Sequence, residues 1–226
     1  MFRRIANFVL GIVCRILFKL DVVDVHHVPT QGPFIAMMNH IYYVDPILVA
    51  TLAPRNIVIM SKIENYQNPL LALVMHLYGT FPVRRGELDM TAIRTSLRLL
   101  EEGHGLLMAP EGTRSKTHTL QEGRDGVAWL AVRSNTPIVP VALSGQEHLG
   151  HNLRRLRRTP LRVVFGRPFR FRPEQGVPLR QQLPRMTREA MYQLAGLLPP
   201  DYRGVYSDLD KATSDTLVLD RAGQDL

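Results

Sequence analysis

Short apolar runs that alternate with helix-forming segments limit the fold of this 226-residue chain more than any other feature. These runs read as buried strands because they are brief and consist almost entirely of apolar residues. They cover residues 34–38, 57–60, 106–108, 138–143 and 161–165. Strands that alternate with helices are typical of an α/β domain in which helices layer a largely parallel sheet. We expect that fold, with any ligand site near the strand ends, where the loops emerge.

Helix boundaries between these strands are marked by capping residues and glycines. Asp45–Pro46 and Asn68–Pro69 each join an N-capping side chain to a proline suited to the first helical position. Asp89 is expected to cap a longer helix, and Gly79 is an expected stop for the helix before it. The expected helices cover residues 47–52, 69–78, 90–102, 127–134 and 186–198.

The first 20 residues form an amphipathic pattern with a wide apolar face. On a helix, Arg4, Arg15 and Lys19 fall close to one line, and apolar side chains cover most of the remaining surface. The longest uncharged run, residues 5–14, is too short to span a bilayer. We therefore predict that residues 1–20 form a helix that lies in the membrane interface, with its basic side chains toward the headgroups. An ordinary amphipathic helix packed on the protein core is the alternative.

The rest of the chain is expected to form a main domain at residues 21–204 and a tail at residues 205–226. The tail is polar and lacks a clear period, so we expect it to be poorly ordered. Four arginines form a tight cluster between positions 154 and 158. This cluster could provide a second membrane contact if the fold brings it to the same side as the N-terminal helix.

The formal net charge of +8 favours an anionic partner, such as anionic lipid or a phosphorylated substrate. Nucleic acid is not expected. The sequence has no RNA-recognition motif, zinc finger or basic reading helix, and its arginine cluster contains no base-stacking aromatic residue. The single cysteine, Cys14, allows no disulfide within the chain and no cysteine-based metal site.

A histidine and an aspartate lie five positions apart, just after the first expected strand. A carboxylate at Asp45 can fix the tautomer of the His40 imidazole and stabilise its protonated form, while the free ring nitrogen abstracts a proton. A surface histidine near a helix-capping aspartate is the plainer interpretation of the same pair.

Two later segments place arginines beside glycines, in loops that follow apolar stretches. Arg84 and Arg85 lie between Gly79 and Gly86, and Arg114 lies in the turn at residues 110–115. Arginine is suited to two-pronged contacts with a phosphate, and hydroxyls and backbone N–H groups in the turn could add to them. Taken singly, each arginine could equally be on a solvated loop.

Together these segments resemble the glycerolphosphate acyltransferase superfamily, in particular bacterial 1-acylglycerol-3-phosphate acyltransferases. The resemblance covers roughly residues 21–170, and its third block is a specific match. The four blocks are N-H-x4-D at Asn39, His40 and Asp45, G-x-x-P-V-x-R at Gly79, Pro82, Val83 and Arg85, P-E-G-T-R-S at residues 110–115, and V-P-V at residues 139–141.

The resemblance implies transfer of a fatty acyl group from acyl-CoA or acyl carrier protein to the 2-hydroxyl of 1-acylglycerol-3-phosphate, giving phosphatidic acid. It implies no metal and no organic cofactor, and a location on the cytoplasmic face of the cell membrane. His40 would be the general base and Asp45 its orienting partner. The residues that would bind the phosphate-bearing lysophospholipid are Lys62, Arg85, Glu111, Gly112, Thr113 and Arg114.

Two positions depart from the family pattern. Tyr42 stands where a serine or another small residue is common, and Ala109 stands where phenylalanine is common. These departures leave open an O-acyltransferase that uses another lyso-lipid acceptor, such as a lyso-aminolipid. A non-catalytic lipid-binding protein on the same fold is the other alternative, and it would be favoured if His40 or Asp45 were absent.

Overall fold

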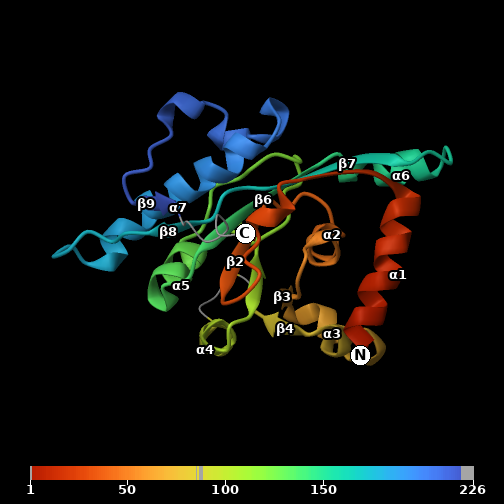
Figure 1. Ribbon diagram of the computed structural model, residues 1–226, viewed down its shortest axis with the longest axis horizontal. Helices are drawn as coiled ribbons and strands as arrows, with labels where there is room; N and C mark the ends of the chain where they lie inside the picture. The colour runs from red at the N-terminus through yellow and green to blue at the C-terminus, as the bar shows by residue number, and fades with distance from the viewer. Residues whose placement is uncertain (1, 85, 87–88, 220–226) are drawn as a thin grey trace.

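A mixed sheet organises the protein in the computed structural model, which describes residues 2–84, 86 and 89–219 (Figure 1). Its strands follow the order β1-β7-β6-β2-β5-β3-β4, and β8 and β9 extend it antiparallel from β6. The strands are β1 Phe18–Val23, β2 Phe34–Met38, β3 Ile57–Lys62, β4 Thr80–Val83, β5 Gly105–Met108, β6 Ile138–Ser144, β7 Thr159–Phe165, β8 Phe169–Phe171 and β9 Leu217–Leu219. The helices are α1 Phe2–Leu17, α2 Asp45–Leu52, α3 Pro69–Tyr78, α4 Met90–Glu101, α5 Gly126–Ser134, α6 Leu149–Leu153 and α7 Leu179–Leu197.

The centre of the sheet is parallel, as the sequence predicts. β6, β2, β5, β3 and β4 run in one direction, and β7 turns back antiparallel to β6. β1 runs parallel to β7 and forms the edge of the sheet beyond it. The α/β fold with a largely parallel sheet is therefore confirmed.

Helices cover both faces of this sheet (Figure 1). Successive side chains of a strand point to opposite faces, so β2 contributes to two cores. Phe34 and Met38 pack with α1 and α2 on one face, and Ile35 and Met37 pack with α4, α5 and α7 on the other. β2 is fully buried, and its carboxyl end delivers the chain to residues 39–45 at the centre of the molecule.

Most of the expected helix ends are found in the structure. The side chain of Asn68 accepts hydrogen bonds from the first turn of α3, and Asp89 does the same for α4. Gly79 ends α3 in the left-handed conformation, with a φ of 84°, which favours glycine. Helix α7 begins at Leu179, well before the expected start at residue 186.

The N-terminal segment differs from the sequence prediction in its second part. Helix α1 ends at Leu17, and residues 18–20 belong to β1 rather than to the helix. The buried residues Cys14 and Phe18 join the core with α2, so α1 is also an amphipathic helix packed on the protein. Local periodicity does not reveal β1, because its partner β7 lies about 140 residues along the chain.

The tail was expected to be poorly ordered, and the structure contradicts this as far as Leu219. Strand β9 pairs with β8, and the buried carboxylate of Glu189 accepts hydrogen bonds from the backbone and side chain of Thr216. Thr213 donates to the same carboxylate. These contacts join the tail to α7, and no local pattern in the tail could predict them. The last residues of the predicted tail, 220–226, lie outside the described residues.

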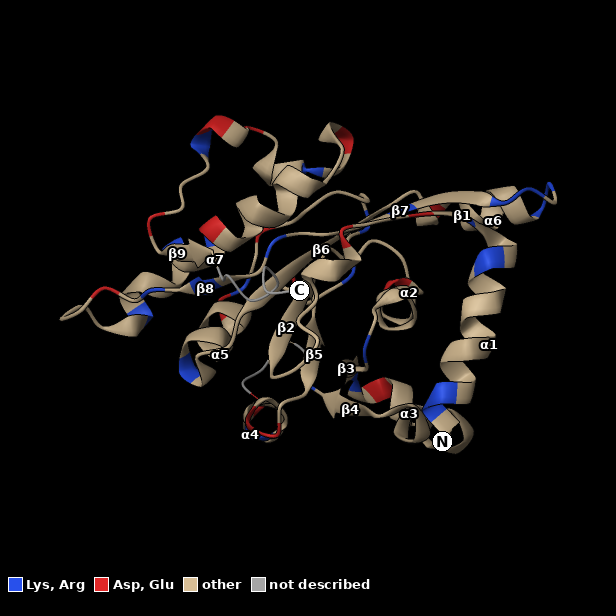
Figure 2. Ribbon diagram, in the orientation of Figure 1, with Lys and Arg blue, Asp and Glu red and all other residues tan. Residues whose placement is uncertain are grey.

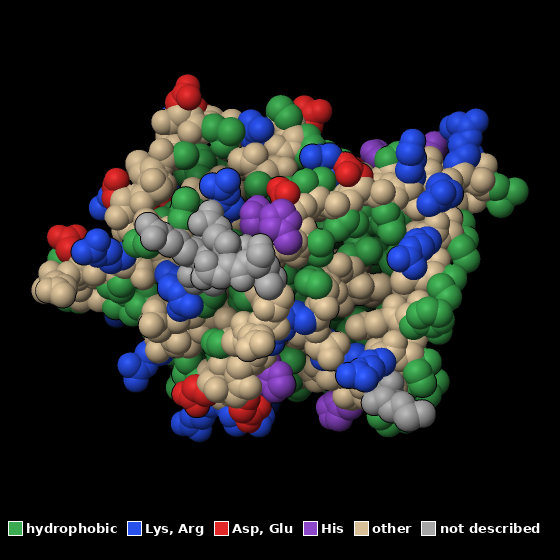
Figure 3. Space-filling model, viewed as in Figure 1, with side chains coloured by type: hydrophobic (Ala, Val, Ile, Leu, Met, Phe, Trp, Pro, Cys, Tyr) green, Lys and Arg blue, Asp and Glu red, His purple; other side chains and the backbone are tan. Residues whose placement is uncertain are grey.

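Apolar side chains remain exposed on α1 and on α3, and these two helices pack against each other. Phe8 is 70% exposed and Ile16 is 64% exposed, while Leu70 on α3 is 72% exposed. The space-filling view shows apolar side chains along the right margin, where α1 runs (Figure 3). Within the described part of the chain, no helix combines the length and the apolar character needed to cross a membrane.

Candidate active site

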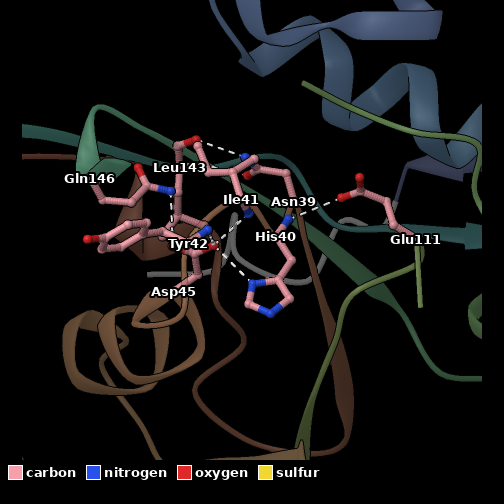
Figure 4. Close-up of polar contacts among 8 residues, drawn as sticks. All are labelled: Asn39, His40, Ile41, Tyr42, Asp45, Glu111, Leu143 and Gln146. Atoms are coloured by element: carbon pink, nitrogen blue, oxygen red, sulfur yellow. Dashed lines mark hydrogen bonds and ion pairs between the residues drawn. The ribbon is translucent and has the colours of Figure 1, made fainter. Parts of the chain in front are cut away.

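His40 and Asp45 lie in contact at the carboxyl end of β2, as the sequence predicts (Figure 4). His40 Nδ1 is 3.0 Å from Asp45 Oδ2, and the histidine side chain is nearly buried. Since Asp45 offers only acceptors, Nδ1 carries the proton in this contact, and Nε2 is left with its lone pair. The pair therefore has the geometry of an oriented general base.

The carboxylate of Asp45 is completely buried and accepts four hydrogen bonds. Besides His40, the backbone N–H groups of Ile41 and Tyr42 donate to Oδ2 at 2.7 Å, and Gln146 Nε2 donates to Oδ1 at 3.1 Å. These donors fix the position of the carboxylate beside the imidazole. The expectation that Asp45 caps a helix is wrong, because Val44 occupies the cap position and the Asp45 side chain turns back toward the loop.

Asn39 fastens the start of the same loop to β6. Its side chain donates to the Leu143 carbonyl at 2.9 Å and accepts from the Leu143 N–H at 2.8 Å (Figure 4). This two-way contact replaces a pair of ladder hydrogen bonds just beyond the end of β2. It therefore holds the backbone that carries His40.

Glu111 supports the His40 loop from the other side. Its side chain is buried and accepts hydrogen bonds from the backbone N–H of His40 at 3.1 Å and of Gln121 at 3.0 Å. Burial raises the pKa of the Glu111 carboxyl to about 7, and the two backbone hydrogen bonds oppose the rise. Glu111 is not among the residues that line the neighbouring cleft. In this structure it supports the His40 loop, and the acceptor-binding role that the family resemblance implies stays a prediction.

A half-open cleft lies against His40, at the carboxyl ends of β2, β3 and β5. One part of its wall is apolar, and Arg84 and Arg124 provide positive charge elsewhere on the wall. Ala109 also lines the cleft, so the small residue at this position leaves space that a phenylalanine would fill. The apolar lining residues are Met38, Pro46, Ile59, Met60, Val83, Leu107, Met108, Ala109, Pro110 and Val127.

Apart from Glu111, the predicted substrate-binding residues divide into three groups. Gly112 lines the cleft, and Thr113 and Arg114 lie in an exposed turn beside it. Lys62 is half-exposed, forms an ion pair with Glu64 at 3.3 Å and is not part of the cleft wall. Arg85 lies outside the described residues.

Tyr42 lies close enough to Arg114 for their electrostatic interaction to matter. Burial raises the pKa of the Tyr42 hydroxyl, its contact with Tyr43 raises it further, and the Arg114 charge opposes the rise. The aromatic residue at this departure from the family pattern is therefore a neighbour of a predicted acceptor-binding arginine.

Sequence reasoning missed two residues of this site, Arg124 and Gln146. The backbone N–H of Arg124 donates to the Pro110 carbonyl at 2.8 Å, which joins its loop to the 110–115 turn. A Cβ atom at Gly112 would come within 3.0 Å of the Arg124 side chain, so glycine lets this arginine cross the turn. The sequence signals are weak: Arg124 lies between Gly123 and Asp125–Gly126, and Gln146 follows an apolar strand.

The arrangement suits transfer chemistry on an amphipathic substrate. A base with a free Nε2 lies on the wall of a cleft that has an apolar part for a hydrocarbon chain and arginines for an anionic group. Among the described residues, no three histidine, cysteine, aspartate or glutamate side chains are grouped in a way that could hold a metal ion.

Known proteins resemble this chain in sequence and in fold. Residues 19–144, which contain all four sequence blocks, match the model of the Acyltransferase family. The chain is 26% identical over 194 residues to the 1-acyl-sn-glycerol-3-phosphate acyltransferase of Bacillus subtilis (strain 168), covering 85% of this chain and 94% of that protein. It is 30% identical over 115 residues to the lyso-ornithine lipid O-acyltransferase of Pseudomonas aeruginosa, covering 50% of this chain and 44% of that protein.

The fold resembles a solved structure as well. The crystal structure of the 1-acyl-sn-glycerophosphate (LPA) acyltransferase, PlsC, from Thermotoga maritima superposes with a TM-score of 0.61. The match covers 83% of this chain and 75% of that one at 19% identity. This likeness shows a shared architecture, including the sheet that carries the His40 loop.

Proposed function

Because the chain belongs to the Acyltransferase family, it is an acyltransferase, and we propose that its reaction is acyl transfer from a thioester to the 2-hydroxyl of 1-acylglycerol-3-phosphate. The donor is acyl-CoA or acyl-loaded acyl carrier protein, and the product is phosphatidic acid. The observation that carries this proposal is the oriented His40–Asp45 pair on the wall of an apolar cleft that also holds arginines.

The proposed reaction needs one base and no covalent intermediate on the protein. Nε2 of His40 takes the proton from the 2-hydroxyl as its oxygen attacks the thioester carbonyl. The carbon–sulfur bond then breaks, and the thiolate takes up the proton that the imidazolium holds. The Asp45 carboxylate orients the ring and stabilises the imidazolium. No cofactor is required besides the thioester co-substrate.

The arginines around the cleft favour an acceptor that carries a phosphate. Arg84 and Arg124 line the cleft, and Arg114 lies in the adjoining turn. A guanidinium group can hold two phosphate oxygens at once, which fixes the orientation of the headgroup as well as its position. The acceptor hydroxyl can then lie against Nε2 while the acyl chain contacts the apolar wall.

A lyso-aminolipid is the second candidate acceptor. Similarity to the Pseudomonas lyso-ornithine lipid O-acyltransferase favours it, as does the aromatic Tyr42 beside Arg114. An ornithine headgroup has no phosphate, so it would depend less on arginine forks than 1-acylglycerol-3-phosphate does. The two acceptors therefore make different demands on the same cleft.

We also propose that the enzyme binds the cytoplasmic face of the cell membrane through α1. The exposed apolar residues of α1 and α3 form one surface, and Arg4, Arg15 and Lys19 lie beside it. Such a surface suits a helix that lies in the interface of an anionic membrane. The lipid acceptor and the lipid product would then remain at the bilayer.

An acyl-transfer assay over a panel of acceptors tests the proposed reaction. The panel contains 1-acylglycerol-3-phosphate, lyso-ornithine lipid and lysophosphatidylcholine, each with acyl-CoA and with acyl carrier protein as donor. We expect the highest kcat/KM for 1-acylglycerol-3-phosphate. A higher value for lyso-ornithine lipid would select the second candidate. Binding of lipid without transfer to any acceptor would mean that the folded protein is not a catalyst.

A further inference from the structure

A loop at residues 153–158 runs from the last residue of α6 to β7 and projects from the molecule beyond the end of α1 (Figure 1). Two leucines in this loop face solvent: Leu156 is 95% exposed and Leu153 is 51% exposed. An exposed leucine is common on its own. Two of them at the tip of a projecting loop need a physical reason.

The backbone of this loop holds Leu156 in an unusual conformation. The N–H of Leu156 bonds to the Leu153 carbonyl and the N–H of Arg157 bonds to the Asn152 carbonyl, each at 3.0 Å. These two hydrogen bonds are those of the Schellman motif, whose left-handed position is normally glycine or asparagine. Leu156 occupies that position with a φ of 52°, so the chain places a large apolar side chain where one is disfavoured.

Arginines surround the exposed leucines. Arg154, Arg155 and Arg157 are exposed on the loop, and Figure 2 shows the tip in blue. Arg158 instead contacts the protein itself: its guanidinium donates two hydrogen bonds to the Phe18 carbonyl, at 2.6 and 3.1 Å. Apolar side chains set among arginines match the boundary between phospholipid headgroups and acyl chains.

The fold brings this loop to the end of α1. Phe18 follows the last residue of α1 directly, and β1 pairs with β7 along its whole length. The contact between Arg158 and Phe18 therefore fixes the loop beside α1. In the space-filling view, basic side chains gather at the upper right, next to the apolar margin formed by α1 (Figure 3).

We propose that the 153–158 loop is a second membrane contact, in which Leu153 and Leu156 enter the interface of an anionic phospholipid bilayer. Arg154, Arg155 and Arg157 contact the lipid phosphates. This inference rests on the proposed membrane binding through α1 and extends it, since two contacts at the ends of one surface fix how the enzyme is oriented on the bilayer. An anionic bilayer is favoured over an acidic protein partner because two exposed leucines lie among the arginines of the loop, beside the exposed apolar residues of α1.

Vesicle co-sedimentation of the full chain tests the proposal. The vesicles are phosphatidylcholine with about one third phosphatidylglycerol, and phosphatidylcholine alone for comparison. Leu156→Asn keeps a residue that tolerates the left-handed conformation and removes the apolar side chain. We expect it to weaken binding to both vesicle types by roughly threefold to tenfold. Replacing Arg154, Arg155 and Arg157 with glutamine should weaken binding to the anionic vesicles only.

Matched controls come from the opposite side of the molecule. Val205→Asn replaces another exposed apolar residue, and an Arg133, Arg180 and Arg188 triple glutamine variant removes the same charge from α5 and α7. Neither control should change sedimentation beyond the general effect of charge. If the triple control loses as much binding as the triple glutamine variant of the loop, the loop is not a specific membrane contact and the proposal is overturned.

An assay of acyl transfer to an acceptor in detergent micelles tests the proposed reaction without the need for membrane binding. It therefore separates a failure of the proposed reaction from a failure of the proposed membrane contact. The loop variants should keep their activity in micelles and lose it on vesicles. Unchanged sedimentation together with a raised KM for acyl carrier protein in micelles would assign the loop to a protein donor and would refute the membrane contact. Absence of transfer by the unmodified enzyme would refute the proposed reaction and leave the sedimentation result to decide the loop.

Discussion

Gln146 Nε2 donates a 3.1 Å hydrogen bond to Oδ1 of Asp45, the carboxylate oxygen that His40 does not contact (Figure 4). Gln146 is fully buried, and it reaches this carboxylate from the far end of β6, about 100 residues away in sequence. Both oxygens of the carboxylate are thus fixed by side chains. We infer that Gln146 is a positioning residue for the His40–Asp45 pair.

Gln146→Leu is predicted to lower kcat about tenfold and to leave the acceptor KM nearly unchanged. With one donor fewer, the Asp45 carboxylate is held less firmly and orients the imidazole less well. Gln181→Leu, an exposed site on α7, is the control. An unchanged kcat, or an acceptor KM that rises as much as kcat falls, would contradict the positioning role.

His40→Ala is predicted to lower kcat by about 10²–10⁴-fold, because the general base is lost. Asp45→Asn should lower it less, since it removes orientation and charge but leaves Nε2 in place. Circular dichroism would establish that each variant is folded. A folded His40→Ala protein with near-normal turnover would refute the mechanism.

Arg124→Lys is predicted to raise the KM for 1-acylglycerol-3-phosphate roughly tenfold, because lysine keeps the charge and loses the fork. Arg114→Lys should act in the same direction. The KM for acyl-CoA should change little in both variants. If both KM values rise together, these arginines serve the donor or the fold.

Glu111→Gln is predicted to reduce activity above pH 7 and to flatten its pH dependence. An ionised Glu111 can accept from both His40 and Gln121, whereas a neutral carboxyl or an amide has one carbonyl oxygen for two N–H donors. Since the folded-state pKa is about 7, the unmodified enzyme should lose activity as the pH falls through 7. A pH–rate profile of the variant that matches the unmodified enzyme would contradict this.

The same carboxyl predicts how stability depends on pH. Burial raises its pKa above the ordinary value of 4.5, so the folded state holds the proton more tightly than the unfolded chain does. Its contribution is present in full below about pH 4.5 and is lost as the pH rises through 7, with a total change of no more than about 3.5 kcal/mol. Denaturant unfolding between pH 4.5 and 8 measures how the free energy of unfolding depends on pH. Glu111→Gln should remove the fall in this free energy that the Glu111 carboxyl causes.

Replacing Phe8 and Ile16 on α1 with asparagine is predicted to release the enzyme from anionic vesicles, with roughly tenfold weaker binding. Both side chains face solvent, so the fold should tolerate the change. Deleting residues 2–20 would be a poor test, because it removes buried Cys14 and part of β1. Unchanged sedimentation of the double variant would locate the anchor elsewhere.

The residues of the site differ in how far sequence could predict them. His40 and Asp45 are close in the chain and share a loop, so their contact follows from local spacing. Gln146 and Glu111 act on this loop from segments about 70 to 100 residues away, and only the sheet topology brings them there. Sequence also predicted the caps of α3 and α4, which depend on neighbouring residues. It missed β1 and β9, whose order comes from distant partners.

The pairing of β1 with β7 has a consequence for the order in which a new chain matures. Strand β1 is made early, yet its partner ends at Phe165, so the edge of the sheet cannot close until about three quarters of the chain has left the ribosome. During that interval α1 has α2 and α3 to pack against but no closed sheet edge. The exposed apolar surface of α1 is available to a nearby bilayer before Gln146, and with it the last contact of the Asp45 carboxylate, has been made. Attachment can thus precede the assembly of a competent site, and a newly made enzyme would acquire activity only where its lipid substrate already is.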